Sequence, residues 1–145
     1  MNAKPYLLTL AALLLWVPVA VALDYDYTVA TAKSVDEVVD LITARAQADG
    51  FKVPGVHTLP SADPFVLVEL CDPVEAKKVM AVDMKFGLLL PCGKIGVWRD
   101  AKDRGKTKIS LLLPANMSRI HPAQEVAAMA SSLDPRLRKI VDAVK

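Results

Sequence analysis

The fold of this chain is constrained most by two apolar segments that a short charged stretch joins. Residues 88–98 (LLLPCGKIGVW) and 105–114 (GKTKISLLLP) each have the character of a β-strand, and the charged stretch RDAKDRGK joins them. A polar connection of this kind, with Gly105 in it, is typical of a hairpin between antiparallel strands. One face of the second strand carries Thr107, Ile109, Leu111 and Leu113, and the other is polar at Lys106, Lys108 and Ser110. We therefore expect an antiparallel sheet with one buried face.

The sharpest helix signal lies between Ser34 and Gly50. Ser34 and Glu37 form a capping box, S-x-x-E, at the start of SVDEVVDLITARAQADG. Apolar residues then recur at helical spacing, and Gly50 is placed to end the helix in a left-handed cap. These signals predict a helix over residues 35–48.

The remaining segments complete an alternation of strands and helices. Residues 23–34 (LDYDYTVATAKS) predict a strand, and FVLVEL, five of whose six residues are apolar, predicts a strand buried on both faces. Asp72 and Pro73 open a second helix in CDPVEAKKVMAVD. Residues 51–64, which contain three prolines, allow only short extended pieces. Residues 122–145 predict one helix broken near Asp134-Pro135, or two helices.

This order of elements indicates an α+β domain. Its expected architecture is a single antiparallel-rich sheet with helices packed on one face, which leaves the other face open or covered by a partner. A second copy of the chain is one such partner, so a homodimer through the open sheet face is possible. The formal net charge of +2 and the 6% aromatic content give no reason to expect nucleic-acid binding.

The N-terminal block predicts export. Lys4 is followed by an uncharged run, residues 5–23, and Ala20-Val21-Ala22 has the small-x-small pattern of a signal-peptidase site. We expect residues 1–22 to be a signal peptide and residues 23–145 to be one periplasmic or secreted domain. The alternative is an uncleaved membrane anchor over residues 5–23, because nineteen uncharged residues are just enough to span a bilayer.

Several of these segments resemble a bacterial family catalogued as domain of unknown function 302. The matching features are Cys71-Asp72-Pro73 after an apolar strand, Ala76 early in the next helix, Leu90-Pro91-Cys92, and the helix that ends at Gly50-Phe51. The resemblance covers roughly residues 25–145. Asp72 stands where the family usually has Asn, and the segment between Phe51 and Phe65 is short and proline-rich. The resemblance implies a small fold similar to the TATA-binding-protein-like fold, often dimeric, and no established chemistry.

The two cysteines are the first candidate site residues. Strand parity places Cys71 on one face with Phe65, Leu67 and Glu69, and Cys92 with Lys94, Gly96 and Trp98. The sequence leaves three interpretations of these cysteines open: two buried inert thiols, a disulfide between them, or functional groups. For the functional interpretation, Cys71 precedes a helix N-terminus and Lys94 shares a face with Cys92, both of which favour a thiolate. Pro91 and Gly93 are expected to open a gap beside Cys92.

These residues support three hypotheses, none of which names a cofactor. The first is an exported binding or carrier module with Cys92, Cys71, Lys94 and Gly93 in its site, for a sulfur species or a soft metal. The second is a thiol-dependent redox protein or enzyme, and the third is a structural dimerisation module with inert cysteines. His57 and His121 are weak additional metal ligands beside Cys71 and Cys92, because their spacing is irregular, and we expect each to be a surface or capping residue. Motifs for serine hydrolases, phosphate loops and zinc proteases do not occur in the sequence.

Overall fold

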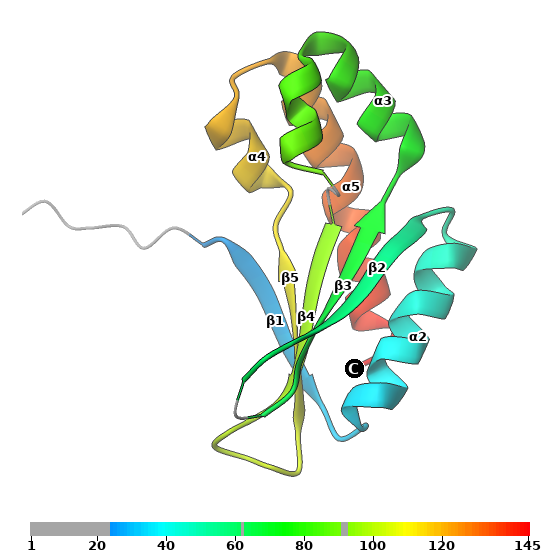
Figure 1. Cartoon of the computed structure of the whole chain (residues 1–145), viewed down its shortest axis with the longest axis vertical. Helices are drawn as coiled ribbons and strands as arrows, with labels where there is room; N and C mark the ends of the chain where they lie inside the picture. The colour runs from blue at the N-terminus through cyan, green and yellow to red at the C-terminus, as the bar shows by residue number, and fades with distance from the viewer. Residues whose placement is uncertain (1–23, 62, 91–92) are drawn as a thin grey trace, which may run out of the picture.

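The computed structural model describes residues 24–61, 63–90 and 93–145. Within them the elements follow in the order β1 (Asp26–Thr31), α2 (Val35–Ala48), β2 (Lys52–Leu59), β3 (Phe65–Cys71), α3 (Pro73–Val82), the 3-10 helix η1 (Met84–Leu88), β4 (Gly93–Arg99), β5 (Thr107–Leu112), α4 (Ala115–Ile120) and α5 (Gln124–Asp142). The strands form one sheet in the order β1-β5-β4-β3-β2, and every neighbouring pair is antiparallel (Figure 1). The expected α+β architecture is confirmed.

The core lies between one face of the sheet and the two long helices. Val68 and Ile95 of the sheet and Ile42 of α2 are fully buried in the same cluster as Leu133 and Leu137 of α5. Because α2 and α5 both pack on this face, the other face of the sheet is left to carry the candidate site. The shorter elements α3 and α4 gather beyond one end of the strands (Figure 1).

Helix α2 forms over the predicted residues because its local signals agree. The Ser34 hydroxyl accepts a hydrogen bond from the amide of Glu37 at 3.2 Å. Gly50 has a φ of +86°, and the Phe51 amide donates to the carbonyl of Ala46, which closes the helix end. The predicted helix 35–48 is confirmed residue for residue.

Strand β2 corrects the expectation for residues 51–64. The segment forms an eight-residue strand at the edge of the sheet, with a register shift between Lys52 and Gly55. Pro54 is tolerated there because an edge strand has one side without ladder hydrogen bonds and the bulge absorbs the irregularity. Proline therefore did not exclude a strand at this position.

Three further expectations also need correction. Strand β3 is buried on one face only, since Val66, Val68 and Leu70 are buried whereas the alternate residues are partly exposed. Residues 88–90 precede β4, and Leu88 belongs to η1 instead. The tail helix α5 is unbroken at Pro135, which lies at an exposed position where water can satisfy the carbonyl that the missing N–H leaves free.

In the described part of the chain, we find no helix with the length and apolar character needed to cross a membrane.

Candidate functional site

The open face of the sheet is built from the strand residues that alternate with the core. On β3 these are Phe65, Leu67, Glu69 and Cys71, and on β4 they are Lys94, Gly96 and Trp98. The antiparallel register pairs Phe65 with Trp98, Leu67 with Gly96, and Glu69 with Lys94. The face on which the sequence placed Cys71 and Lys94 is thus confirmed, and it presents apolar and charged groups side by side.

An aromatic pair lies on this face where β3 begins and β4 ends. The rings of Phe65 and Trp98 stack with their centroids 5.4 Å apart and an interplanar angle of 23°. A Cβ atom at Gly96 would collide with the Phe65 ring, so the ring occupies the space that a side chain would otherwise fill. Gly96 therefore allows Phe65 to lie flat across the sheet and form one wall of a hollow.

This hollow, which we call the sheet-face hollow, has a volume of about 340 Å³. Its lining is mainly apolar and aromatic, and includes Tyr25, Phe65, Leu67, Trp98 and Leu112. Two charged residues, Asp26 and Lys94, also line it. A mainly apolar concavity with a few convergent polar groups is the usual form of a small-molecule site.

The two charged groups of the sheet-face hollow differ in how they are satisfied. The Asp26 carboxylate accepts hydrogen bonds from the hydroxyls of Thr28 at 2.5 Å and Ser110 at 2.8 Å. These bonds, that from Thr28 above all, hold the pKa of Asp26 below its ordinary value. The ammonium group of Lys94, in contrast, has no ion pair or hydrogen-bond partner among the residues that the structure describes. Lys94 is therefore the charge available to a ligand.

His57 and Glu69 lie at the β2 side of the same face. His57 Nε2 is 3.4 Å from Glu69 Oε2, and the imidazole ring lies over Gly55, where a Cβ atom would collide with it. The side chain of His57 is 55% exposed. His57 is thus a surface residue, as expected from the sequence. It contacts Glu69, the register partner of Lys94.

The sequence-predicted thiol at Cys71 has the opposite electrostatics to those expected. Cys71 is half-buried at the end of β3, and burial together with the adjacent Asp72 carboxylate raises its pKa. The positive end of α3 is occupied by Asp72 itself, whose side chain accepts from the first free amides of the helix. Cys71 is therefore a protonated thiol at neutral pH, with little nucleophilic character. The other cysteine, Cys92, lies outside the described residues.

Gly93 faces the core. A Cβ atom there would lie 3.0 Å from Leu70 Cβ and 3.2 Å from Leu137 Cδ2. The absent side chain makes room for α5 against the sheet, whereas the sequence led us to expect a gap that opens toward a ligand. Pro91, the other residue of that expectation, also lies outside the described residues.

His121 is a capping residue, and no metal centre can be built around the candidate ligands that the structure describes. His121 follows α4, its Nδ1 accepts from the Ala123 amide at 3.2 Å, and its ring packs edge-on against Phe86. Between residues 24 and 145, apart from the gaps at 62 and 91–92, no three His, Cys, Asp or Glu side chains are grouped to hold an ion.

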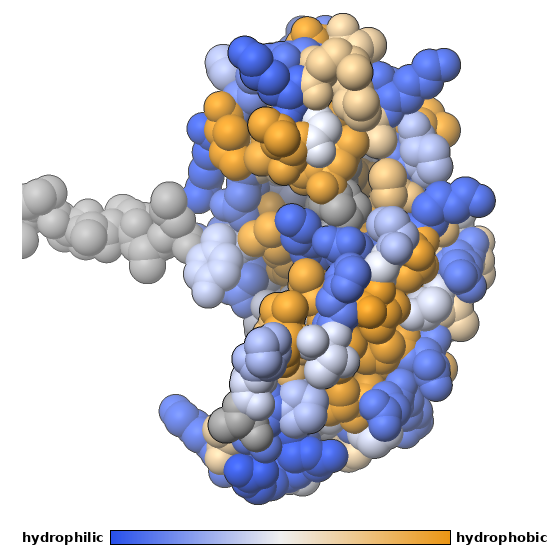
Figure 2. Space-filling view, viewed as in Figure 1, coloured by the Kyte–Doolittle hydropathy of each residue, from blue (hydrophilic) through white to orange (hydrophobic). Residues whose placement is uncertain are grey.

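Two further hollows, which the sequence did not predict, lie beyond the sheet-face hollow. The junction hollow, of about 140 Å³, is lined by Lys94 and Leu112 on one side and by Leu88, Leu89 and Ile120 on the other. The end hollow, of about 240 Å³, lies between η1 and α4 against Phe86 and His121. The outline of the molecule is concave here, and hydrophobic side chains gather above and below the concavity (Figure 2).

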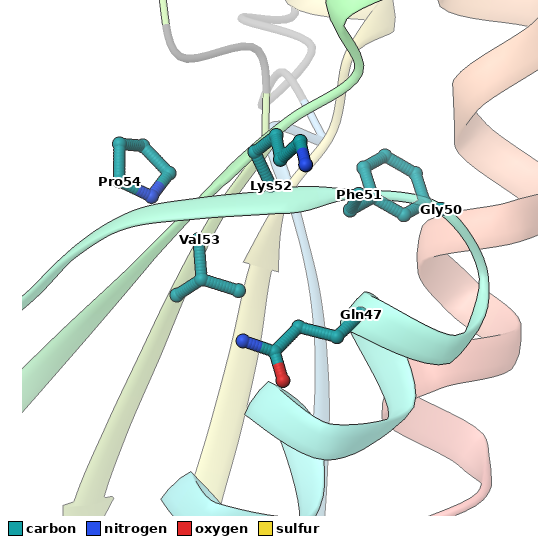
Figure 3. Close-up of a pocket in the computed structure, with 6 residues that line it drawn as sticks. All are labelled: Gln47, Gly50, Phe51, Lys52, Val53 and Pro54. Carbon is teal, nitrogen blue, oxygen red and sulfur yellow. The ribbon is translucent and has the colours of Figure 1, made fainter.

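A hollow larger than the sheet-face hollow, of about 430 Å³, lies elsewhere, between the end of α2 and the start of β2. Residues 47–54 line all of it. Val53 points toward Gln47 of α2, while Lys52 and Pro54 project on the other side of the strand (Figure 3). This space is a local crevice at a helix-to-strand turn, and it gathers fewer distant segments than the sheet-face hollow does.

Comparison with known proteins agrees with this fold. The crystal structure of an uncharacterized conserved protein DUF302 from Bacillus stearothermophilus superimposes with a TM-score of 0.74. The two sequences are 23% identical, and the match covers 85% of this chain and 100% of that one. No curated protein sequence matches the chain. The family model "Domain of unknown function DUF302" matches residues 27–144, and the chain therefore belongs to the DUF302 family.

Proposed function

We propose that this protein is an exported binding or carrier module that holds a small ligand in the sheet-face hollow. The observation that carries the proposal is that one concavity combines an aromatic wall, Phe65 and Trp98, with the ammonium group of Lys94, which is unpaired among the described residues. An apolar wall provides affinity through surface burial, and a charged group that is available to the ligand fixes its orientation.

Export is supported by the N-terminal sequence. Cleavage after Ala22 would leave a mature chain that begins at Leu23, three residues before the first strand of the sheet. Mass spectrometry of the protein from its native host should show Leu23 as the first residue. A retained Met1 in the membrane fraction would instead identify residues 5–23 as an anchor.

The raised pKa of Cys71 favours non-covalent binding over thiol chemistry at this position. A redox or sulfur-transfer site needs a thiolate, and both burial and the Asp72 carboxylate oppose its formation. Cys71 lies on the same face as the hollow but is not among the residues that line it. We therefore propose Lys94, Phe65 and Trp98 as the binding residues in place of the cysteine pair.

The proposal is tested with 8-anilinonaphthalene-1-sulfonate, a fluorescent probe with an aromatic body and one anionic group. Leu67→Glu introduces a carboxylate into the hollow and should weaken probe binding about tenfold. Val56→Glu is the matched control, because Val56 is exposed on β2 and does not line the hollow. If both variants bind the probe as the wild type does, with unfolding midpoints within about 2 °C of wild type, the hollow is not the binding site.

A further inference from the structure

We propose that the ligand is an amphiphilic carboxylate, with its head at Lys94 and its alkyl chain in the cleft between η1 and α4. This inference rests on the proposed binding function and names the class of ligand. It follows from three features of the described residues: the continuity of the hollows, the exposure of the apolar side chains that line them, and the distribution of charge.

The three hollows follow one another in a groove, and each shares lining residues with the next. The sheet-face hollow and the junction hollow share Lys94 and Leu112. The junction hollow and the end hollow share Leu88, Leu89 and Ile120. An elongated molecule can therefore extend from the sheet to the end of the domain without leaving an apolar surface, and Lys94 lies where the sheet part meets the cleft.

The cleft between η1 and α4 exposes large apolar side chains to water. Leu88 is 86% exposed and Ile120 is 65% exposed, and they face the same hollows. Phe86 and Leu89 provide the inner wall of the end hollow. An alkyl chain in the cleft would remove these surfaces from water, and each buried methylene group contributes about fourfold to affinity.

The charges along the groove set the orientation of such a ligand. Asp26 is register partner to Leu112, which lines the junction hollow together with Lys94, and the hydroxyls of Thr28 and Ser110 hold Asp26 ionised. The head group is repelled by Asp26 and binds Lys94, which has no partner among the described residues. The alkyl chain extends toward Leu88 and Ile120, where it does not desolvate the ionised carboxylate.

The far end of the groove offers a weaker anchor. Asp83 and Lys85 both line the end hollow, and the Asp83 carboxylate already accepts from the Lys85 amide. A carboxylate placed there would meet one charge of each sign, whereas Lys94 is the one charged residue among the described residues that line the junction hollow. Lys77, which is exposed on α3 and lines none of the three hollows, is the matched control for Lys94.

A second copy of the chain is the competing occupant of this face. It would have to bring a carboxylate to Lys94, and the two acids on the face are engaged: Asp26 by its hydroxyl partners and Glu69 by His57. Charge complementarity therefore favours a small anion over a symmetric dimer.

The test is isothermal titration calorimetry with decanoate and decan-1-ol, which share an alkyl chain and differ in charge. We expect one decanoate per chain, bound about tenfold more tightly than the alcohol. Lys94→Gln should remove that difference in affinity, whereas Lys77→Gln should leave it unchanged. Ile120→Asp, at an exposed position, should weaken the binding of both probes.

The outcomes separate this inference from the proposed function. Equal affinities for decanoate and decan-1-ol, or an unchanged preference in Lys94→Gln, would overturn the carboxylate assignment. If decanoate does not bind while the anilinonaphthalene probe still responds to Leu67→Glu, the hollow is a binding site for another ligand class. A dimer by analytical ultracentrifugation that excludes decanoate would show that a second copy is the occupant, and would also overturn the inference.

Discussion

Asp72 connects the end of β3, which carries part of the site, to the helical layer. Its Oδ1 accepts from the first free amides of α3 at 2.9 and 3.1 Å. Its Oδ2 is 2.6 Å from Arg136 Nη1 of α5. Arg136 also donates to the carbonyl of Asp49, and its guanidinium lies 4.5 Å from the centre of the Phe51 ring. One carboxylate thus caps a helix and holds a cation that joins two other segments.

The cost of removing it can be divided between these two roles. Loss of an N-cap side chain costs about 1 kcal/mol. A hydrogen bond to a charged group contributes about 1.5–3 kcal/mol when shielded, and we discount it to about 1–2 kcal/mol because the Arg136 side chain is 36% exposed. Asp72→Ala should therefore lower the free energy of unfolding by about 2–3 kcal/mol. Asp72→Asn keeps the cap and should lose only the part due to Arg136, about 1–2 kcal/mol.

The pH dependence separates the two roles further. Burial of Asp72 opposes ionisation, but the hydrogen bonds from Arg136 and the helix amides outweigh it, so its pKa lies below the ordinary value. A carboxyl group with a depressed pKa in the folded state stabilises the protein above the unfolded-state pKa of about 4. That contribution is lost as the pH falls through the lower, folded-state pKa.

Urea denaturation at pH 7 and at pH 3 measures these effects. At pH 7 the free energy of unfolding should decrease from wild type to Asp72→Asn to Asp72→Ala. At pH 3 the difference in this free energy between wild type and Asp72→Asn should be smaller. In a double-mutant cycle, Arg136→Gln should remove most of the difference in unfolding free energy between the protein with Asp72 and the Asp72→Asn variant. If Asp72→Asn is as stable as the wild type at pH 7, the ion pair contributes nothing and the reasoning is refuted.

Three further predictions concern glycines and the described thiol. Gly93→Ala should destabilise the protein by about 1–3 kcal/mol through overpacking of the core. Gly87→Ala is the control: nothing lies within 4 Å of its new Cβ atom, so stability, measured from urea midpoints for both variants, should change by less than about 0.5 kcal/mol. Gly50→Val should cost about 1–2 kcal/mol because of the left-handed backbone, and a variant as stable as the wild type would contradict that cap. Alkylation of Cys71 at pH 7 should be much slower than that of free cysteine and should accelerate on denaturation, and equal rates before and after denaturation would contradict its burial and raised pKa.

The parts of the fold that the sequence predicted are those with local causes. Helix α2 has its cap, its apolar spacing and its terminal glycine within one segment, so local signals and tertiary packing favour the same helix. The hairpin of β4 and β5 follows from its apolar strands and charged turn. Strand parity also assigned Lys94 and Cys71 to the correct face, because side chains alternate wherever a strand forms.

The parts that were missed depend on where a segment lies in the sheet or on contacts between distant segments. Pro54 excludes a central strand but not an edge strand, and the sequence does not show that β2 lies at the edge. The apolar run of β3 appeared buried on both faces because Phe65 and Leu67 line a hollow on the open side. The junction hollow and the end hollow need η1 and α4 beside the sheet, and these short elements leave almost no periodic signal. The apolar residues 88–90 and Ile120, which lie outside the strands and the long helices, were the available clue.

The most direct test of the binding site is a map of backbone amide chemical shifts during titration of the isotopically labelled protein with decanoate. Binding in the groove predicts that the largest shifts fall on Lys94 and Leu112, at the head group, and on Leu88 and Ile120, along the alkyl chain, with smaller shifts at Gly96. The crevice of residues 47–54, which has the larger volume, serves as the internal control. Shifts that centre on residues 47–54 and leave Lys94 and Gly96 unmoved would contradict the assignment of the site to the open face of the sheet.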